Sequence, residues 1–193
     1  MPDPLDEQAL IRHAVDDPDA FQELYHRYVR RVYGYVASRL PHTQDAEDVV
    51  AEVFLRVIKN LDQLRNRQPA SFPAWLFVIV RHTVADHYRQ YGQAANHLSL
   101  DNTEAPAPSE SQPDHVLSER AEAVMVRQLI SQLPERQREI VTLRYYGGLR
   151  NQEIAAVLGI GEKTVSGYLS RALNDLRQRY SATISQEGSA NHE

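Results

Sequence analysis

Hydrogen-bonding side chains share one face of a segment near the C-terminus. The segment NQEIAAVLGIGEKTVSGYLSRAL, which begins at Asn151, has apolar residues at the spacing of two short helices, with Gly159 where the first must end. On the second helix an apolar stripe starts at Val165, and the opposite face can donate to and accept from base edges and phosphates. The outward residues are Lys163, Gly167, Ser170, Arg171, Asn174 and Gln178, with Ser166 and Tyr168 on the flanks. We predict a helix-turn-helix over 151–171 that meets DNA, and an ordinary helical hairpin is the alternative.

Aromatic and cationic residues are interleaved in a second segment, SFPAWLFVIVRHTVADHYRQ. Its members are Phe72, Trp75, Phe77, Arg81, His82, His87, Tyr88 and Arg89. Such a mixture suits unpaired bases, which stack on aromatic rings while cations hold the phosphates. The alternative is that the large apolar residues are core, and we favour it for Trp75. His82 and His87 are five residues apart, a poor spacing for one metal ion on a helix, so we expect no metal site.

An acidic face characterises a third segment, DAEDVVAEVFLRVIKNL. Its valines and Leu61 recur on one side of a helix, whereas Asp45, Asp48 and Glu52 share the other side. A solvated acidic stripe is the commoner reading. Beside a nucleic-acid-binding domain, the stripe can instead dock on a basic protein surface.

The distribution of charge supports two polyanion-binding parts, although the chain as a whole has a net charge of −5. Residues 20–91 and 134–180 each have a net charge of +3, whereas 1–19, 92–133 and 181–193 are acidic. The chain has no cysteine, which excludes disulfides and thiolate chemistry. It shows no catalytic or phosphate-loop motif, no secretory signal and no apolar run long enough to span a bilayer. We therefore expect a cytoplasmic protein that is not an enzyme and has no cofactor.

The helical periodicity predicts an all-α protein of two helical domains joined by a flexible acidic linker. The first domain is 1–91, with helices over 20–40, 43–61 and 72–91. Residues 92–118, rich in Pro, Ser, Asp and Glu, form the linker. The second domain is 119–180, with helices near 119–132, 135–146, 151–158 and 162–180, and 181–193 is a disordered tail.

Three stretches together resemble the extracytoplasmic-function (ECF) sigma factors of bacterial RNA polymerase. FQELYHRYVRRVYGYV with DAEDVVAEVFLRVIKNL is similar to the first conserved block of that family. FPAWLFVIVRHTVADHYRQ is similar to the block that melts and reads the −10 element. LPERQREIVTLRYYGGLRNQEIAAVLGIGEKTVSGYLSRAL is similar to the block that reads the −35 element. The three occur in the family's order, with the linker before the last.

The resemblance implies a protein that binds core RNA polymerase and directs it to promoters. The residues implied for docking on core polymerase are Asp45, Asp48, Glu52, Phe54 and Arg56. A loop over 64–71 is implied to capture a flipped base of the −10 strand. The residues implied for the −10 strand, with those of this loop, are Leu64, Arg65, Asn66, Arg67, Ser71, Arg81, His82, Asp86 and Arg89. Those implied for the −35 major groove are Lys163, Thr164, Ser166, Gly167, Tyr168, Ser170 and Arg171. The linker would thread the polymerase channel, and an anti-sigma factor is a partner expected by analogy.

Two departures from the family pattern concern specificity. His82 stands where the family often has Asn, and Ser166, Gly167 and Tyr168 stand where it typically has two cations around a serine. Fewer phosphate contacts predict weaker binding to the −35 element. We expect Lys163 and Arg171 to contribute a larger share of that binding. The alternative function is a helix-turn-helix regulator that acts without joining polymerase, which leaves 20–91 unexplained.

Overall fold

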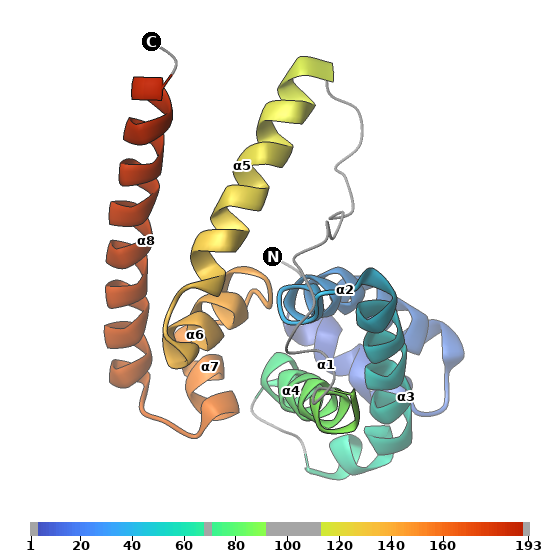
Figure 1. Cartoon of the computed structure of the whole chain (residues 1–193). Helices are drawn as coiled ribbons and strands as arrows, with labels where there is room; N and C mark the ends of the chain where they lie inside the picture. Colours follow the sequence, from blue (N-terminus) through green and yellow to red (C-terminus); the bar gives the residue numbers. More distant parts are fainter. Residues whose placement is uncertain (1–3, 68–70, 92–112, 191–193) are drawn as a thin grey trace. The chain divides into compact units, whose positions relative to one another are not determined.

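The computed structural model describes residues 4–67, 71–91 and 113–190, and within these ranges every regular element is a helix (Figure 1). The helices are α1 (Pro4–His13), α2 (Pro18–Ala37), α3 (Thr43–Arg67), α4 (Phe72–Tyr91), α5 (Pro113–Ser131), α6 (Glu135–Tyr145), α7 (Asn151–Leu158) and α8 (Glu162–Ala190). The predicted all-α class is therefore confirmed. None of the described helices has the length and apolar character needed to cross a membrane.

The helices divide into two compact units. We call Met1–Ala105 with Tyr146–Leu149 the N-terminal unit, and Pro106–Tyr145 with Arg150–Glu193 the C-terminal unit. The linker expected over 92–118 lies outside the described residues as far as 112, and its remaining residues belong to α5. The tail expected from residue 181 continues α8 to Ala190, and 191–193 lie outside the described residues.

The N-terminal unit is built around α2, which packs on α1, α3 and α4. Its first turn is set by Asp17, whose side chain accepts a hydrogen bond from the Asp19 backbone N–H at 2.9 Å, and by Pro18, which suits the first helical position. The buried core residues that α2, α3 and α4 contribute include Leu24, Val32, Val36, Val53, Val57, Leu76, Phe77 and Val80. Burying each such side chain contributes roughly 1.5–3 kcal/mol, so this cluster holds the unit together.

Two features of this unit differ from the sequence-based expectation. Helix α3 continues to Arg67 instead of ending near Leu61, because Leu61 and Leu64 extend its buried stripe by another turn. Helix α1 was not expected at all. It is held to α2 in part by the Tyr28 hydroxyl, which donates to the carboxylate of Glu7.

In the C-terminal unit, α8 packs on α5, α6 and α7. The fully buried side chains at its centre include Ile140, Leu143 and Ile154, together with Val165 and Ala172 on α8. Further along α8, the Tyr180 hydroxyl donates to Glu122 of α5 at 2.5 Å. These contacts fix which side of α8 faces its neighbours and which side is exposed.

The turn between α7 and α8 depends on one glycine. Gly159 has φ 64° and ψ 36°, the left-handed conformation in which a Cβ atom clashes with the backbone, as the sequence predicted. Gly167, by contrast, lies within α8, and a Cβ added there would meet no atom within 4 Å. The backbone conformation therefore requires glycine at position 159, whereas position 167 can accept a side chain.

Alanine substitutions at these glycines are expected to change stability in opposite directions. Gly159→Ala should destabilise α7 and α8 by about 1–2 kcal/mol, because alanine is strained at positive φ. Gly167→Ala, the matched control, should stabilise α8 by up to about 1 kcal/mol, because alanine loses less entropy in a helix. Hydrogen exchange of the α7 and α8 amides in the full chain measures both changes. A loss of protection in Gly167→Ala equal to that in Gly159→Ala would contradict this account.

Candidate functional site

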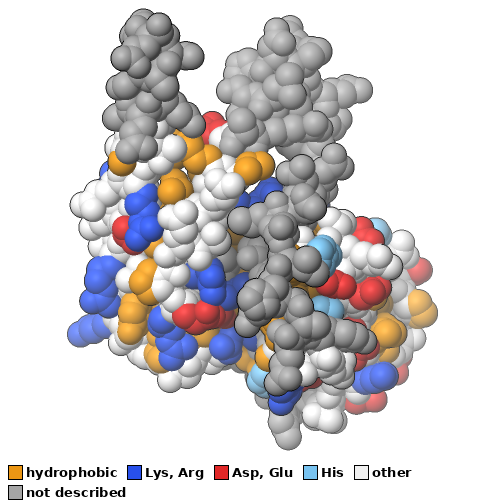
Figure 2. Space-filling model, in the orientation of Figure 1, with side chains coloured by type: hydrophobic (Ala, Val, Ile, Leu, Met, Phe, Trp, Pro, Cys, Tyr) orange, Lys and Arg blue, Asp and Glu red, His pale blue; other side chains and the backbone are white. Residues whose placement is uncertain are grey.

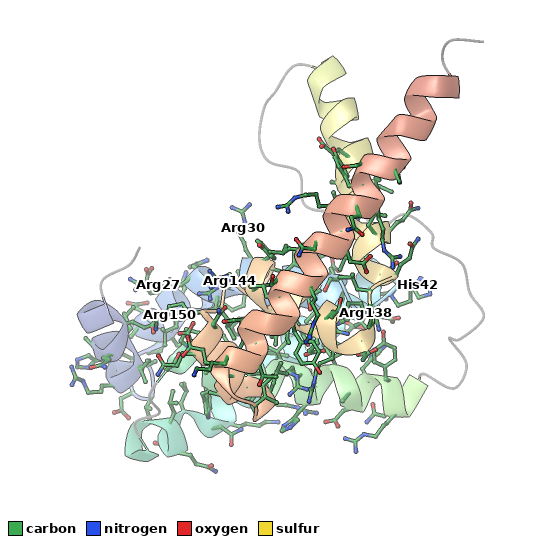
Figure 3. The ribbon with its side chains drawn as sticks, turned by 90° about the vertical axis from the view of Figure 1, so that its left-hand side faces the viewer. Arg27, Arg30, His42, Arg138, Arg144 and Arg150 are labelled. Atoms are coloured by element: carbon green, nitrogen blue, oxygen red, sulfur yellow. The ribbon has the colours of Figure 1, made fainter. Side chains whose placement is uncertain are left out.

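The helix-turn-helix is positioned by hydrogen bonds at the start of α7. The Arg150 backbone N–H donates to the buried Glu153 carboxylate at 2.7 Å, and the Arg150 guanidinium donates to its other oxygen at 3.2 Å. Both hydrogen bonds are donated by Arg150 to Glu153, and the first of them satisfies an otherwise unpaired backbone donor at the start of α7. Arg150 is labelled in Figure 3, where α8 lies in front of the viewer.

The first turns of α8 present the predicted DNA-contacting residues on the surface. Six of them are exposed, namely Lys163, Thr164, Ser166, Gly167, Ser170 and Arg171, and Tyr168 is half-buried on the flank. Figure 2 shows Lys and Arg side chains gathered on the face of the C-terminal unit that includes this part of α8. The structure thus brings all seven predicted −35 residues onto one helix, with six of them exposed.

Two side-chain contacts organise this surface. The Asn151 side-chain amide donates to the Ser166 hydroxyl at 3.0 Å, which connects the start of α7 to α8. The guanidinium carbon of Arg171 lies 4.8 Å from the centroid of the Tyr168 ring, a cation–π distance. Neither contact was predicted from the sequence.

The acidic segment forms the outer face of α3, as expected. Asp48 is exposed, and the side chains of Asp45 and Glu52 are 38% and 44% exposed. Phe54 is buried, with its ring centroid 4.7 Å from that of Tyr25, so it supports α3 from inside. Figure 2 shows Asp and Glu side chains over the part of the N-terminal unit where α3 lies.

Sequence reasoning missed two apolar residues on this outer face. Leu55 and Ile58 are 51% and 50% exposed, although they lie on the same helix as the buried valines. Together with the exposed Ala51 they occupy positions i, i+4 and i+7, which defines a second stripe on the solvent side of α3. Counting them on a helical wheel beside Asp48 would have found them, since they fall opposite Val50, Val53 and Val57.

An ion-pair network joins α3 to α4. Arg56 donates through Nε to Glu52 and through Nη1 to Asp86, at 2.8 and 2.7 Å, and Arg89 also donates to Asp86. The hydrogen bonds from Arg56, and then those from Arg89, lower the pKa of Asp86 below its usual range. Residues that the sequence assigned to polymerase binding and to the −10 strand are therefore in direct contact with each other.

The other predicted −10 residues occupy varied environments. His82 is exposed, whereas Arg81 is half-buried. Burial raises the pKa of Tyr35, and Arg81 is one of two arginines whose charge partly offsets that rise. Leu64 is buried in the core and so supports α3 rather than facing outward. The Ser71 hydroxyl accepts a hydrogen bond from the Ala74 backbone N–H at 3.4 Å, a helix cap for α4.

The remaining residues of the expected loop are only partly described. The backbone of 65–67, which contains Arg65, Asn66 and Arg67, is helical and ends α3. Residues 68–70 lie outside the described residues. Trp75 is half-buried, with its ring centroid 5.7 Å from that of Phe72.

The Asp86 network predicts a pH-dependent contribution to stability. Because its folded-state pKa is lowered, the Asp86 carboxylate stabilises the fold near neutral pH and loses that effect as the pH falls below about 4. Asp86→Asn should therefore cost less than about 1 kcal/mol at pH 7, the range of part-exposed ion pairs, and should cost less at pH 3 than at pH 7. Urea unfolding followed by the fluorescence of the single tryptophan, Trp75, reports on this unit. Asp48→Asn is the control, and an equal loss for Asp86→Asn at both pH values would rule out the network as its cause.

Comparison with known proteins matches both units to described families. A family model described as Sigma-70 region 2 matches residues 24–93, and one described as Sigma-70, region 4 matches residues 123–176. The first match covers α3, α4 and α2 from residue 24 onward, and the second covers the helix-turn-helix.

Whole-chain relatives agree with these matches. The ECF RNA polymerase sigma-E factor of Escherichia coli K12 is 32% identical over 181 residues, which cover 89% of this chain and 93% of that protein. The ECF sigma factor BldN of Streptomyces coelicolor is 32% identical over 165 residues, which cover 86% of this chain but 62% of BldN. Among solved structures, a chain of the structure of CnrH in complex with the cytosolic domain of CnrY matches with a TM-score of 0.67 and 26% identity, and the match covers 92% of this chain and 98% of that chain.

The region 2 and region 4 matches occur in the family's order. The likeness to the sigma-E factor extends over most of both chains. The chain belongs to the ECF sigma factors of bacterial RNA polymerase.

Proposed function

We propose that this chain binds core RNA polymerase and directs it to promoters, which it reads at −10 with the N-terminal unit and at −35 with the C-terminal unit. The observation that carries the proposal is the pairing, in one chain, of a region 2 unit and a region 4 helix-turn-helix whose DNA-facing side is exposed. A regulator that acts without polymerase would need only the second of these.

The outer face of α3 is the surface we assign to core polymerase. It combines an exposed apolar centre, Leu55 and Ile58, with acidic residues at its border, Asp48 and Glu52. An apolar centre surrounded by polar groups is the usual composition of a protein–protein interface, and acidic groups favour a basic partner surface. Arg56 is bound to Glu52 and Asp86, so its part is to hold the acidic groups in place.

The −10 strand is assigned to α4 and the end of α3. His82 and Arg89 are exposed on α4, and Arg89 is 77% exposed although it pairs with Asp86. Exposed cations of this kind can hold the phosphates of a single strand. Arg81 also interacts with the buried Tyr35, so its role is partly structural.

The activity requires no catalytic group from this chain, since the polymerase supplies the chemistry. We place the protein in the cytoplasm, where polymerase and promoters are. An anti-sigma factor that covers one of the two assigned surfaces is the further partner that the family membership suggests.

Run-off transcription with purified core polymerase and a genomic library tests the proposal. The chain should bind core polymerase without DNA and should give transcripts with shared −10 and −35 sequences upstream. DNA binding by the chain alone, without co-purification of core polymerase, would support the regulator instead.

Truncating the apolar centre of the α3 surface should weaken polymerase binding. Leu55→Ala with Ile58→Ala is expected to lower the affinity for core polymerase by about tenfold or more, because buried apolar anchors dominate interface energies. The fold should be unchanged, since both side chains are half exposed. The matched control is Val124→Ala with Val126→Ala on α5, whose side chains are 45% and 38% exposed. Fluorescence anisotropy of labelled chain with core polymerase measures the affinity, and equal affinities for the two double variants would remove α3 as the docking surface.

A further inference from the structure

The exposed face of α8 has few charged groups with which to choose bases. Between Glu162 and Arg171, the only cations are Lys163 and Arg171. A lysine ammonium is a point charge that holds phosphates without distinguishing bases, whereas an arginine guanidinium is a planar fork that matches a base edge. Base selection on this helix therefore depends heavily on Arg171.

Arg171 differs from other arginines of the C-terminal unit in what it contacts. Arg138, Arg150 and Arg179 each form an ion pair with a nearby carboxylate. Among the described residues, the contact recorded for Arg171 is instead the face of the Tyr168 ring, at 4.8 Å from its centroid. A cation–π contact engages the charge of the guanidinium and pairs its N–H groups with no hydrogen-bond acceptor, so they are still available to a ligand.

Tyr168 also restricts the orientation of that edge. Tyr168 is one helical turn before Arg171 and is half-buried on the flank of α8, so its ring can act as a platform with less freedom to move than a fully exposed ring. A guanidinium held against such a platform loses less conformational freedom when it binds, which strengthens binding in that one orientation. The pairing therefore favours a ligand with two coplanar acceptors, and in the major groove that is the O6 and N7 edge of guanine.

Small residues beside this pair allow the helix to come close to DNA. Gly167 has no Cβ and faces open space, and Ser166 and Ser170 beside it are exposed and short. The Ser166 hydroxyl already accepts a hydrogen bond from Asn151 at 3.0 Å, which leaves its proton to donate outward. The Tyr168–Arg171 pair is thus the largest feature on this part of the helix.

We propose that Tyr168 is a positioning residue that sets base specificity, because its ring holds the Arg171 guanidinium in the plane that reads one guanine of the −35 element. This inference rests on the proposed promoter-reading function and adds to it the base and the residue that orients the contact. Arg171 touches the base, and Tyr168 acts through Arg171.

The test uses the full chain with core RNA polymerase on promoters that the wild-type holoenzyme transcribes. Every position of the −35 element is varied over the four bases, and transcript yield is measured for each. The wild type should prefer guanine at one position by about tenfold or more, the range of a bidentate arginine contact. Tyr168→Leu, which removes the aromatic face, and Arg171→Lys, which removes the planar fork, should both reduce that preference to about threefold or less. Preferences at the other positions should stay as in the wild type.

Two variants separate positioning from general effects. Tyr168→Phe retains the aromatic ring without the hydroxyl and should retain the guanine preference. Arg177→Ala removes an exposed cation further along α8 and should alter no base preference.

The inference is overturned if Tyr168→Leu keeps the wild-type preference, if Tyr168→Phe loses it, or if Tyr168→Leu lowers activity equally on every template. Arg171→Lys changes an exposed side chain and so remains informative if Tyr168→Leu disturbs the fold. An unchanged guanine preference in Arg171→Lys overturns the inference. Failure of the wild type to transcribe any promoter would instead refute the proposed function, which keeps the two results distinct.

Discussion

The burial of Val165 and Ala172 is the constraint on which the exposed face of α8, the proposed DNA-binding face, depends. Both side chains are fully buried, and α8 packs on α6 and α7, so rotation of α8 about its axis would expose them at a cost of roughly 1–3 kcal/mol each. That fixed rotation puts Ser166, Gly167 and Ser170 on the outside. The left-handed turn at Gly159 then sets where α8 begins relative to α7. A reading surface made of small polar residues is possible because the opposite side of the same helix contributes the stability.

Helix α3 likewise has one side that stabilises the fold and another that is exposed. Its valines and Leu64 form a buried stripe that extends the helix to Arg67, while Leu55 and Ile58 remain exposed on the other side. An exposed apolar pair contributes little to folding, so the fold of the N-terminal unit does not require it. Docking of core polymerase on this face, as proposed above, would bury the apolar surface that this unit leaves in water.

The sequence was sufficient to predict the features that depend on periodicity and on backbone geometry. The helical class, the left-handed Gly159 and the bounds of α4 and α7 all follow from apolar spacing and helix-ending residues. Periodicity was insufficient where a stripe continued through polar residues, which is why α3 was expected to end near Leu61. It was also insufficient for α1, whose contact with α2 includes a hydrogen bond between residues 21 positions apart, Glu7 and Tyr28.

Side-chain pairing was the part of the candidate site that spacing could not reveal. A sequence counts Arg56, Arg89 and Arg171 as equal positive charges, but the structure distinguishes them. Arg56 is held by two carboxylates and Arg89 by one, so part of their hydrogen-bonding capacity is used within the protein. Arg171 rests on an aromatic face, which neutralises none of its charge and leaves its donors available. The number of cations on a helix therefore does not show by itself how many of their donors are available to DNA, because some are already bound within the protein. Only two cations lie between Glu162 and Arg171 on α8, and the contact of Arg171 with Tyr168 gives the proposed base contact an available donor set that the composition of this face does not reveal.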